Sequence, residues 1–292
     1  MATAPARGWQ AFRIYLEMIK IEHSIFALPF AMIGMMWAAG GWPGPWKFLW
    51  IVIAMVSCRS AAMAFNRIAD RDIDQVNPRT RMRAIPAGLL QLRQANLFFF
   101  ASCAIFFIAS AMLNTLALAL SPVALLVTLG YSMCKRFTPL SHFVLGLSLG
   151  IAPAAAWIGV RGDLRWPIVL ITFSVLFWTA GFDIIYSLQD EEFDRQHGLR
   201  SLPQWLGKRR ALTASRLCHV LAIAFLAGGG FLFGAGVAFY AGVVFAATLL
   251  GYEQSLVKPE DLSKVNLAFF TLNGFVSIGV FGFALIDLLI RR

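Results

Sequence analysis

Long apolar segments constrain this chain more strongly than any other feature of its sequence. Nine stretches approach the roughly 20 residues that an α-helix needs to cross a lipid bilayer. They cover residues 24–41, 46–65, 95–114, 116–133, 140–160, 167–186, 216–233, 235–252 and 266–290. Backbone N–H and C=O groups in lipid must find partners within their own segment, which favours helices. We therefore expect an all-α, polytopic membrane protein with nine transmembrane helices.

The composition agrees with this class. Of the 292 residues, 59% are hydrophobic and 14% are charged, and the mean hydropathy is +0.71. Soluble domains carry about 25% charged residues, so the chain lies well outside their range. No stretch has the composition of a separate soluble domain, and residues 1–292 are predicted to form a single integral membrane domain.

The distribution of cationic residues predicts the topology. With nine helices and a cytoplasmic N-terminus, twenty of the 25 Lys and Arg residues fall on the cytoplasmic side and five on the other. Such an excess is what the positive-inside rule describes. The net charge of +10 therefore indicates orientation in membrane lipid, and we expect no nucleic-acid partner.

Acidic residues gather in two windows on the predicted cytoplasmic side. Eight of the 15 Asp and Glu residues lie in residues 66–74 and 183–194, each window directly following an apolar segment. The first window repeats at i, i+4 and i+8, with Asn66, Asp70 and Asp74. The second repeats at i, i+3, i+7 and i+11, with Asp183, Tyr186, Asp190 and Asp194. Each spacing places its residues on one face of a helix that extends past the membrane.

The two windows predict a site for a metal and a diphosphate. Two acidic stripes that face each other repel unless a cation lies between them. Carboxylate oxygens suit Mg²⁺, which bridges to substrate phosphates and keeps part of its water. The predicted metal ligands are Asp70, Asp74, Asp190 and Asp194. Arg and Lys neutralise phosphate oxygens, and the predicted diphosphate-binding residues are Asn66, Arg71, Arg79, Arg83, Lys135, Arg136 and Arg200.

These motifs resemble those of the UbiA-type intramembrane aromatic prenyltransferases. The two windows match the family's Asn-x-x-x-Asp-x-x-x-Asp and Asp-x-x-Tyr-x-x-x-Asp-x-x-x-Asp signatures. Residues 77–88 match its Arg-Thr-x-x-Arg-Pro-x-Pro-x-Gly segment, except that Ala84 and Ile85 replace Pro and Leu. Residues 131–136 resemble its Tyr-x-x-x-Lys-Arg segment. The resemblance covers essentially the whole chain.

The resemblance implies a fold, a cellular location and a reaction. The fold is a helical bundle around a central cavity that opens to the cytoplasmic face of a bacterial or archaeal inner (plasma) membrane. The reaction transfers a polyprenyl group from polyprenyl diphosphate to an aromatic acid. Residues 20–30 and 181–190 resemble the 4-hydroxybenzoate polyprenyltransferase-like branch. Its acceptors are 4-hydroxybenzoate in ubiquinone synthesis and 1,4-dihydroxy-6-naphthoate in menaquinone synthesis by the futalosine route.

The implied mechanism divides the acidic residues by role. Mg²⁺ and nearby cations stabilise the departing diphosphate, and the aromatic ring attacks the allylic cation while water is excluded. The catalytic candidates are Asp183, Tyr186 and Asp190. Asp183 and Tyr186 precede Asp190 by one to two helical turns, so we expect them to orient the acceptor or to steady the cation.

Smaller features have simpler interpretations. We expect Glu22 and His23 either to contact the acceptor acid or to anchor the chain at the membrane interface. His142 and His219 belong to no partner pattern and are predicted to be structural. Asp287 is predicted to pair with Arg291 at i, i+4.

Other functions predict other patterns. A CDP-alcohol phosphatidyltransferase would hold its aspartates in one compact segment, whereas Asp70 and Asp190 lie 120 residues apart. A transporter would place ionisable groups near the bilayer midplane. A further branch of the same fold, which attaches a tail to haem or to a chlorophyll precursor, differs only in its acceptor pocket.

Overall fold

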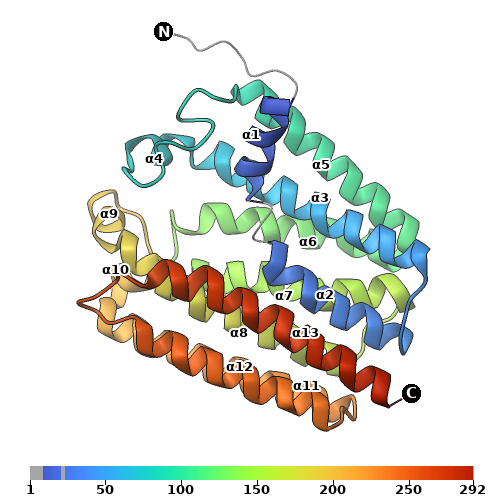
Figure 1. Ribbon diagram of the computed structural model, residues 1–292. Helices are drawn as coiled ribbons and strands as arrows, with labels where there is room; N and C mark the ends of the chain where they lie inside the picture. Colours follow the sequence, from blue (N-terminus) through green and yellow to red (C-terminus); the bar gives the residue numbers. More distant parts are fainter. Residues whose placement is uncertain (1–8, 21–23, 292) are drawn as a thin grey trace.

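The computed structural model describes residues 9–20 and 24–291, and these residues form an all-helical protein (Figure 1). Eight helices are long. They are α3 (Pro45–Ala69), α5 (Leu92–Leu113), α6 (Thr115–Cys134), α7 (Ser141–Arg161), α8 (Trp166–Ser187), α11 (Lys208–Leu232), α12 (Val237–Leu256) and α13 (Asn273–Ile290), the last preceded by the π-helical turn η3 (Leu267–Leu272). The shorter elements are α1 (Trp9–Ile19), α2 (Ser24–Ala39), α4 (Arg71–Val76), η2 (Leu188–Asp190), α9 (Glu191–Gln196) and α10 (Leu202–Leu206). The described ranges contain no β-strand.

Eight helices in the described ranges are long and apolar enough to cross a membrane, which makes the chain an integral membrane protein. The first expected span corresponds to α2, which has only 16 residues. It reaches the length of a span only together with the end of α1, from which it is bent by 71°. The expected count of nine therefore holds only if this bent pair counts as one span.

The ends of the helices agree closely with the predicted apolar segments. The largest difference is at α11, which begins eight residues before the predicted start at residue 216. Asn114 separates α5 from α6: its side-chain oxygen accepts a hydrogen bond from the Ala117 N–H at 2.8 Å, and so caps α6. Its amide also donates to the carbonyl of Ile158 at 2.7 Å, which ties this turn to α7.

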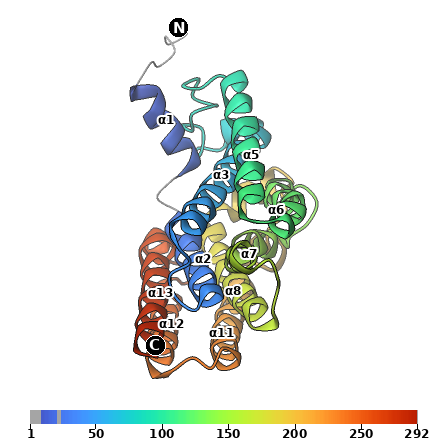
Figure 2. The same cartoon turned by 90° about the vertical axis from the view of Figure 1, so that its right-hand side faces the viewer.

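The long helices follow one another in a ring in which each long helix from α3 to α13 packs against the next one along the chain, and α2 packs against both α7 and α13 (Figure 2). The short helix α1 lies beside this ring and packs on α3. At one end of the bundle lie α4 and α9, which carry the last residues of the two acidic windows, and α10 (Figure 1). The sequence thus brings both windows to the same end.

Small residues allow α7 and α8 to approach closely. A Cβ atom on Gly146 would lie 2.3 Å from the carbonyl oxygen of Leu176, and one on Gly150 would lie 2.7 Å from that of Thr172. Small residues spaced by four are a common way for helices to pack in membranes. This contact sets the position of α8, the helix that carries Asp183 and Tyr186.

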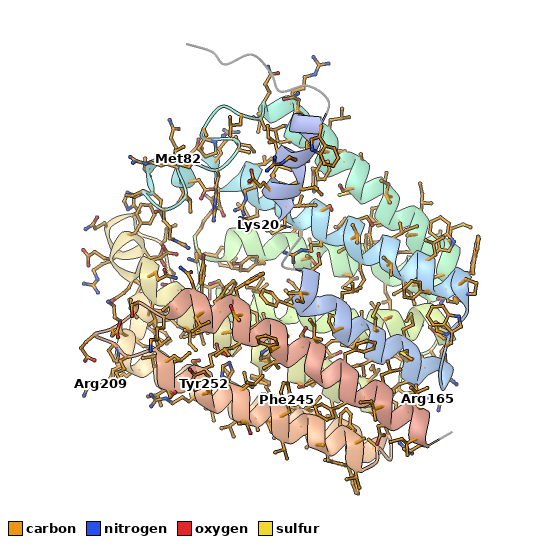
Figure 3. The ribbon with its side chains drawn as sticks, in the orientation of Figure 1. Lys20, Met82, Arg165, Arg209, Phe245 and Tyr252 are labelled. Atoms are coloured by element: carbon orange, nitrogen blue, oxygen red, sulfur yellow. The ribbon has the colours of Figure 1, made fainter. Side chains whose placement is uncertain are left out.

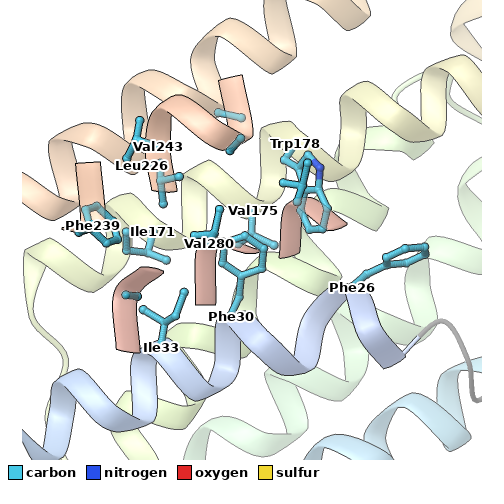
Figure 4. Close-up of a cluster of buried hydrophobic side chains, with 14 of the residues drawn as sticks. Phe26, Phe30, Ile33, Ile171, Val175, Trp178, Leu226, Phe239, Val243 and Val280 are labelled. Atoms are coloured by element: carbon cyan, nitrogen blue, oxygen red, sulfur yellow. The ribbon is translucent and has the colours of Figure 1, made fainter. Parts of the chain in front are cut away.

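A hydrophobic core of aromatic and aliphatic side chains packs α2 against α8 and the neighbouring helices (Figure 4). Phe26 and Phe30 of α2 contact Trp178 of α8, and Phe26 also contacts Phe182. All four side chains are buried. Such packing excludes water from the apolar interior that lies beyond the acidic windows.

Candidate functional site

The first acidic window spans a break between two helices. Asn66 lies in the last turn of α3, Asp70 occupies the turn between α3 and α4, and Asp74 lies in α4. The sequence predicted one continuous helix, but the regular α-helix is interrupted at Asp70, where the Asn66 amide donates to the Asp70 carboxylate at 2.8 Å.

The second window is broken in the same manner. Asp183 and Tyr186 lie in the last two turns of α8, Asp190 closes the 3₁₀ turn η2, and Asp194 lies in α9. Asp183 and Tyr186 come before the 3₁₀ turn, so they lie nearer the membrane interior than the other two residues.

Both windows line one cavity, which has about 870 Å³ of space including open solvent. Its walls contain eleven of the thirteen residues that the sequence predicted for the site. They are Asn66, Asp70, Asp74, Arg79, Arg83, Lys135, Arg136, Asp183, Tyr186, Asp190 and Asp194.

Two arginines from the loop after α4 bind the acidic windows. Arg79 reaches across the cavity: Nε donates to Asp190 Oδ1 at 3.0 Å, Nη2 contacts the other oxygen, and Nη1 donates to the Tyr186 hydroxyl at 2.7 Å. Arg83 Nη1 donates to both oxygens of Asp74, at 2.7 and 2.8 Å. Charge-assisted bonds of this kind are strong and directional.

Two cations at the end of α6 complete the charge pairing. Arg136 Nη2 lies 3.1 Å from Asp70 Oδ1, and Lys135 Nζ lies 3.6 Å from Asp194 Oδ2. Each predicted metal ligand therefore faces one predicted diphosphate-binding cation. The repulsion expected between the two stripes is offset here by protein cations.

The carboxylates fit a hard divalent ion that is shared with a substrate. In the described part of the chain, no three His, Cys, Asp or Glu side chains converge as an all-protein cage. However, Asp194 Oδ2 is buried without a hydrogen-bond partner, since the distance to Lys135 exceeds hydrogen-bond length. Burial, and then the nearby Asp74, raise the pKa of Asp70. Both features suit Mg²⁺ held by one or two carboxylates with phosphate or water in its other positions.

Arg71 and Arg200 are the two predicted residues that the structure does not bring to the cavity wall. Arg71 Nε donates to the neighbouring Asp72 at 3.3 Å. Arg200 instead holds the end of α6: its backbone N–H donates to the carbonyl of Lys135 and its guanidinium to that of Phe137, both at 2.7 Å.

His142 is a residue at the site whose contact the sequence pattern did not reveal. Its Nδ1 lies 2.7 Å from Asp183 Oδ2, and its side chain is fully buried. One sequence feature could have pointed to a place near the site: His142 lies at the predicted cytoplasmic end of a span, six residues after Arg136. His219, by contrast, lies away from the cavity, and its ring contacts the Gln254 side chain at 3.1 Å.

A second, more open cavity adjoins the first. The two share Arg79, Thr80, Arg83 and Tyr186 as a common wall. Lys20 and Arg67 add further positive charge to the second cavity, and residues of α1 form one side of it. Glu22 and His23, which were predicted either to contact the acceptor or to anchor the chain at the interface, lie outside the described residues.

Comparisons with known proteins agree with this geometry. Residues 27–275 match the model of the UbiA prenyltransferase family. A 4-hydroxybenzoate octaprenyltransferase from Nitrosomonas europaea is 31% identical over 95% of each chain. The apo structure of a UbiA homologue from Aeropyrum pernix superposes with a TM-score of 0.83, at 36% identity over 91% of this chain and 98% of that one. A UbiA homologue from Archaeoglobus fulgidus bound to DMAPP and Mg²⁺ shares the fold, with a TM-score of 0.75 at 19% identity over 94% of this chain and 99% of that one.

Proposed function

Because the chain belongs to the UbiA prenyltransferase family, we propose that it transfers a polyprenyl group from a polyprenyl diphosphate to 4-hydroxybenzoate or to 1,4-dihydroxy-6-naphthoate. The observation that carries this proposal is the single cavity in which both acidic windows meet four cations. The name shared by the curated relatives, 4-hydroxybenzoate octaprenyltransferase, favours the first acceptor. The family match over residues 27–275 sets aside the phosphatidyltransferase and the transporter.

The four charge pairs supply the diphosphate site in this proposal. Asp70, Asp74, Asp190 and Asp194 would hold Mg²⁺, the ion that is bound together with DMAPP in the structure of the Archaeoglobus homologue. When bound, that ion supplies neutralisation of the charge that develops on the departing diphosphate. Arg79, Arg83, Lys135 and Arg136 line the cavity, and in this proposal they would bind the phosphate oxygens. Arg supplies planar, bidentate geometry for this purpose.

Asp183 and Tyr186 act on the acceptor rather than on the metal. They lie at the end of α8, where the cavity meets the apolar interior. The Tyr186 ring packs against Phe269 with centroids 4.2 Å apart, and this aromatic wall keeps water from the reacting carbon. The second cavity meets the first at Tyr186, and its Lys20 and Arg67 offer positive charge to an acceptor carboxylate.

The site faces the cytoplasm in this proposal, and the membrane is the inner (plasma) membrane of a bacterium or archaeon. The support is the cationic excess of the segments at this end of the bundle, which include the loop after α4 and the start of α11. An acceptor made in the cytoplasm reaches such a site without crossing the bilayer.

A membrane assay tests the proposal. Membranes that contain the protein are incubated with a polyprenyl diphosphate and each acceptor, and products are identified by mass. Membranes with Asp190→Asn serve as the matched negative control. We expect a prenylated product that disappears with a chelator and returns when excess Mg²⁺ is added. The absence of product with either acceptor would reject the proposed function.

A further inference from the structure

The contact between His142 and Asp183 joins two segments of the site. His142 lies in the first turn of α7, and Asp183 lies in the last turns of α8. The two residues are 41 positions apart, and their side chains meet at 2.7 Å. The imidazole is fully buried, while the Asp183 side chain keeps 13% of its surface exposed and lines the cavity.

The hydrogen bond at the second ring nitrogen of His142 defines which of the two nitrogens carries the proton. Its Nε2 accepts a hydrogen bond from the backbone N–H of Leu202 at 3.3 Å. A backbone amide can only donate, so Nε2 must carry the lone pair and Nδ1 must carry the proton. The neutral imidazole therefore donates from Nδ1 to Asp183 Oδ2. The hydrogen bonds of the described residues include none to Asp183 Oδ1, the oxygen left for a ligand in the cavity.

The same imidazole connects Asp183 to the loop that follows the second acidic window. This loop follows α9 and carries Leu199, which lines the cavity and whose N–H donates to the carbonyl of Asp194 in α9 at 2.9 Å. Leu202 begins α10 at the end of the loop. His142 thus contacts both the residue assigned to the acceptor and the segment next to the diphosphate site.

We propose that His142 is a positioning residue that holds one oxygen of Asp183 so that the other accepts a hydrogen bond from the hydroxyl group of the aromatic acceptor. This inference rests on the proposed function. It assigns His142 no contact with either substrate. Its loss leaves Asp183 free to rotate within the cavity, and the acceptor then loses its orientation while the diphosphate keeps its own partners.

Two conservative variants separate the contacts of His142. The amide nitrogen of Asn occupies nearly the place of Nδ1, so His142→Asn retains a donor for Asp183. The amide of Gln reaches the place of Nε2, so His142→Gln retains the partner of Leu202 and loses the donor. The control is His219→Asn, which removes another buried histidine away from the cavity.

Steady-state kinetics with each substrate varied test the proposal on detergent-purified, monodisperse protein. We expect His142→Gln to lower kcat/KM for the acceptor by about 10- to 100-fold, the effect of losing a hydrogen bond to a charged group. KM for the prenyl diphosphate stays within about twofold, and His142→Asn restores most of the activity. Equal losses for both substrates, or an unrescued His142→Asn whose thermal stability matches that of His219→Asn, would overturn the proposal.

A double-mutant cycle keeps the proposal testable if the single variants are unstable. If His142 acts through Asp183, adding His142→Gln to Asp183→Asn should cost little beyond Asp183→Asn alone. A further loss of the same size as in the single variant would show that His142 acts independently, and would reject the proposal. Wild-type protein without prenyl transfer to either acceptor would instead reject the proposed function, so the two failures are distinguishable.

Discussion

At the scale of single residues, acidic and basic side chains of this site hold each other in place by charge pairing. Asp190 and Arg79 come from segments 111 positions apart, yet the guanidinium binds both carboxylate oxygens and the hydroxyl of Tyr186. Asp74 is held in a comparable way by Arg83. Exposed acids in the same windows lack such partners across the cavity. Asp72, for example, pairs with its neighbour Arg71, and its side chain is 82% exposed.

This difference predicts the effect of removing a carboxylate. Asp190→Ala and Asp194→Ala should each lower turnover by at least about 100-fold, because each removes a hard ligand for a diphosphate-bound Mg²⁺. Asp72→Ala in the first window and Glu192→Ala in the second should remain within about twofold of wild type, because surface substitutions have small effects. Product formation at saturating Mg²⁺ is the measurement. Near-normal turnover in Asp190→Ala and Asp194→Ala would contradict the assignment of metal ligands.

Two arginines in the loop after α4 should likewise differ in how much their substitution affects the reaction. Arg79→Gln should raise KM for the prenyl diphosphate about tenfold or more, since it removes a charge-assisted hydrogen-bond donor from the cavity. Arg81 lies two residues away and is exposed, so Arg81→Gln is the matched control. Initial rates at varied diphosphate concentration give both values. Similar changes in the two variants would indicate a general effect of positive charge on this face.

Pairs of helices determine where these residues lie. The close contact of α7 with α8 through Gly146 and Gly150 places His142 beside Asp183. At the other end of the bundle, α13 caps α12: Asp287 accepts hydrogen bonds from the N–H groups of Gly236 and Phe239 at 2.9 and 3.3 Å. The predicted pairing of Asp287 with Arg291 is confirmed, at 3.5 Å.

The α7–α8 contact predicts that Gly146→Ala is destabilising. The added Cβ would lie 2.3 Å from the backbone oxygen of Leu176, which cannot move without shifting α8. Overpacking of this kind typically costs about 1–3 kcal/mol. A thermal unfolding scan in detergent should show a lower midpoint for Gly146→Ala and an unchanged or higher one for Gly282→Ala, a helical glycine with no atom within 4 Å of its Cβ position. Equal midpoints would mean that the two helices are not closely packed.

The cap on α12 predicts a second, smaller loss of stability. Asp287→Ala leaves two N–H groups at the start of α12 without acceptors and should cost about 1 kcal/mol. The exposed Glu260 provides the control, since Glu260→Ala removes one acidic residue from a surface loop. The same unfolding scan compares the two, and a lower midpoint for Glu260→Ala than for Asp287→Ala would contradict the cap.

At the scale of the whole molecule, the ring of helices has two different ends. Met82 and Arg165 lie at opposite ends of the bundle (Figure 3), and the acidic windows lie at the end that contains Met82. The ring closes between α13 and α2, so the first and last long segments of the chain are neighbours.

The orientation of this ring can be measured by labelling. Met82→Cys should react with a membrane-impermeant thiol reagent only from the cytoplasmic side, and Leu164→Cys only from the opposite side, because both side chains are exposed. Three of the four native cysteines are buried and Cys58 is partly buried, so wild-type protein supplies a low background. Labelling of both positions from one side would reject the topology.

The sequence by itself determined the class, the ends of most helices and the family. Apolar length and charge asymmetry are local or additive properties, so they can be read without knowing which side chains touch. The two acidic signatures likewise named Asp70, Asp74, Asp190 and Asp194, because their spacing repeats along one helix face.

The tertiary structure decided which partners these residues have. Asp190 meets Arg79, Asp183 meets His142, and Arg200 turns to a backbone carbonyl away from the cavity, although its place in the motif resembles that of the other cations. The spacing of the acidic residues also did not reveal the helix breaks at Asp70 and after Ser187, since a short turn preserves the helical period. Contacts between segments more than forty residues apart depend on how helices pack, and a periodic pattern along one segment contains no information about the face that another segment presents.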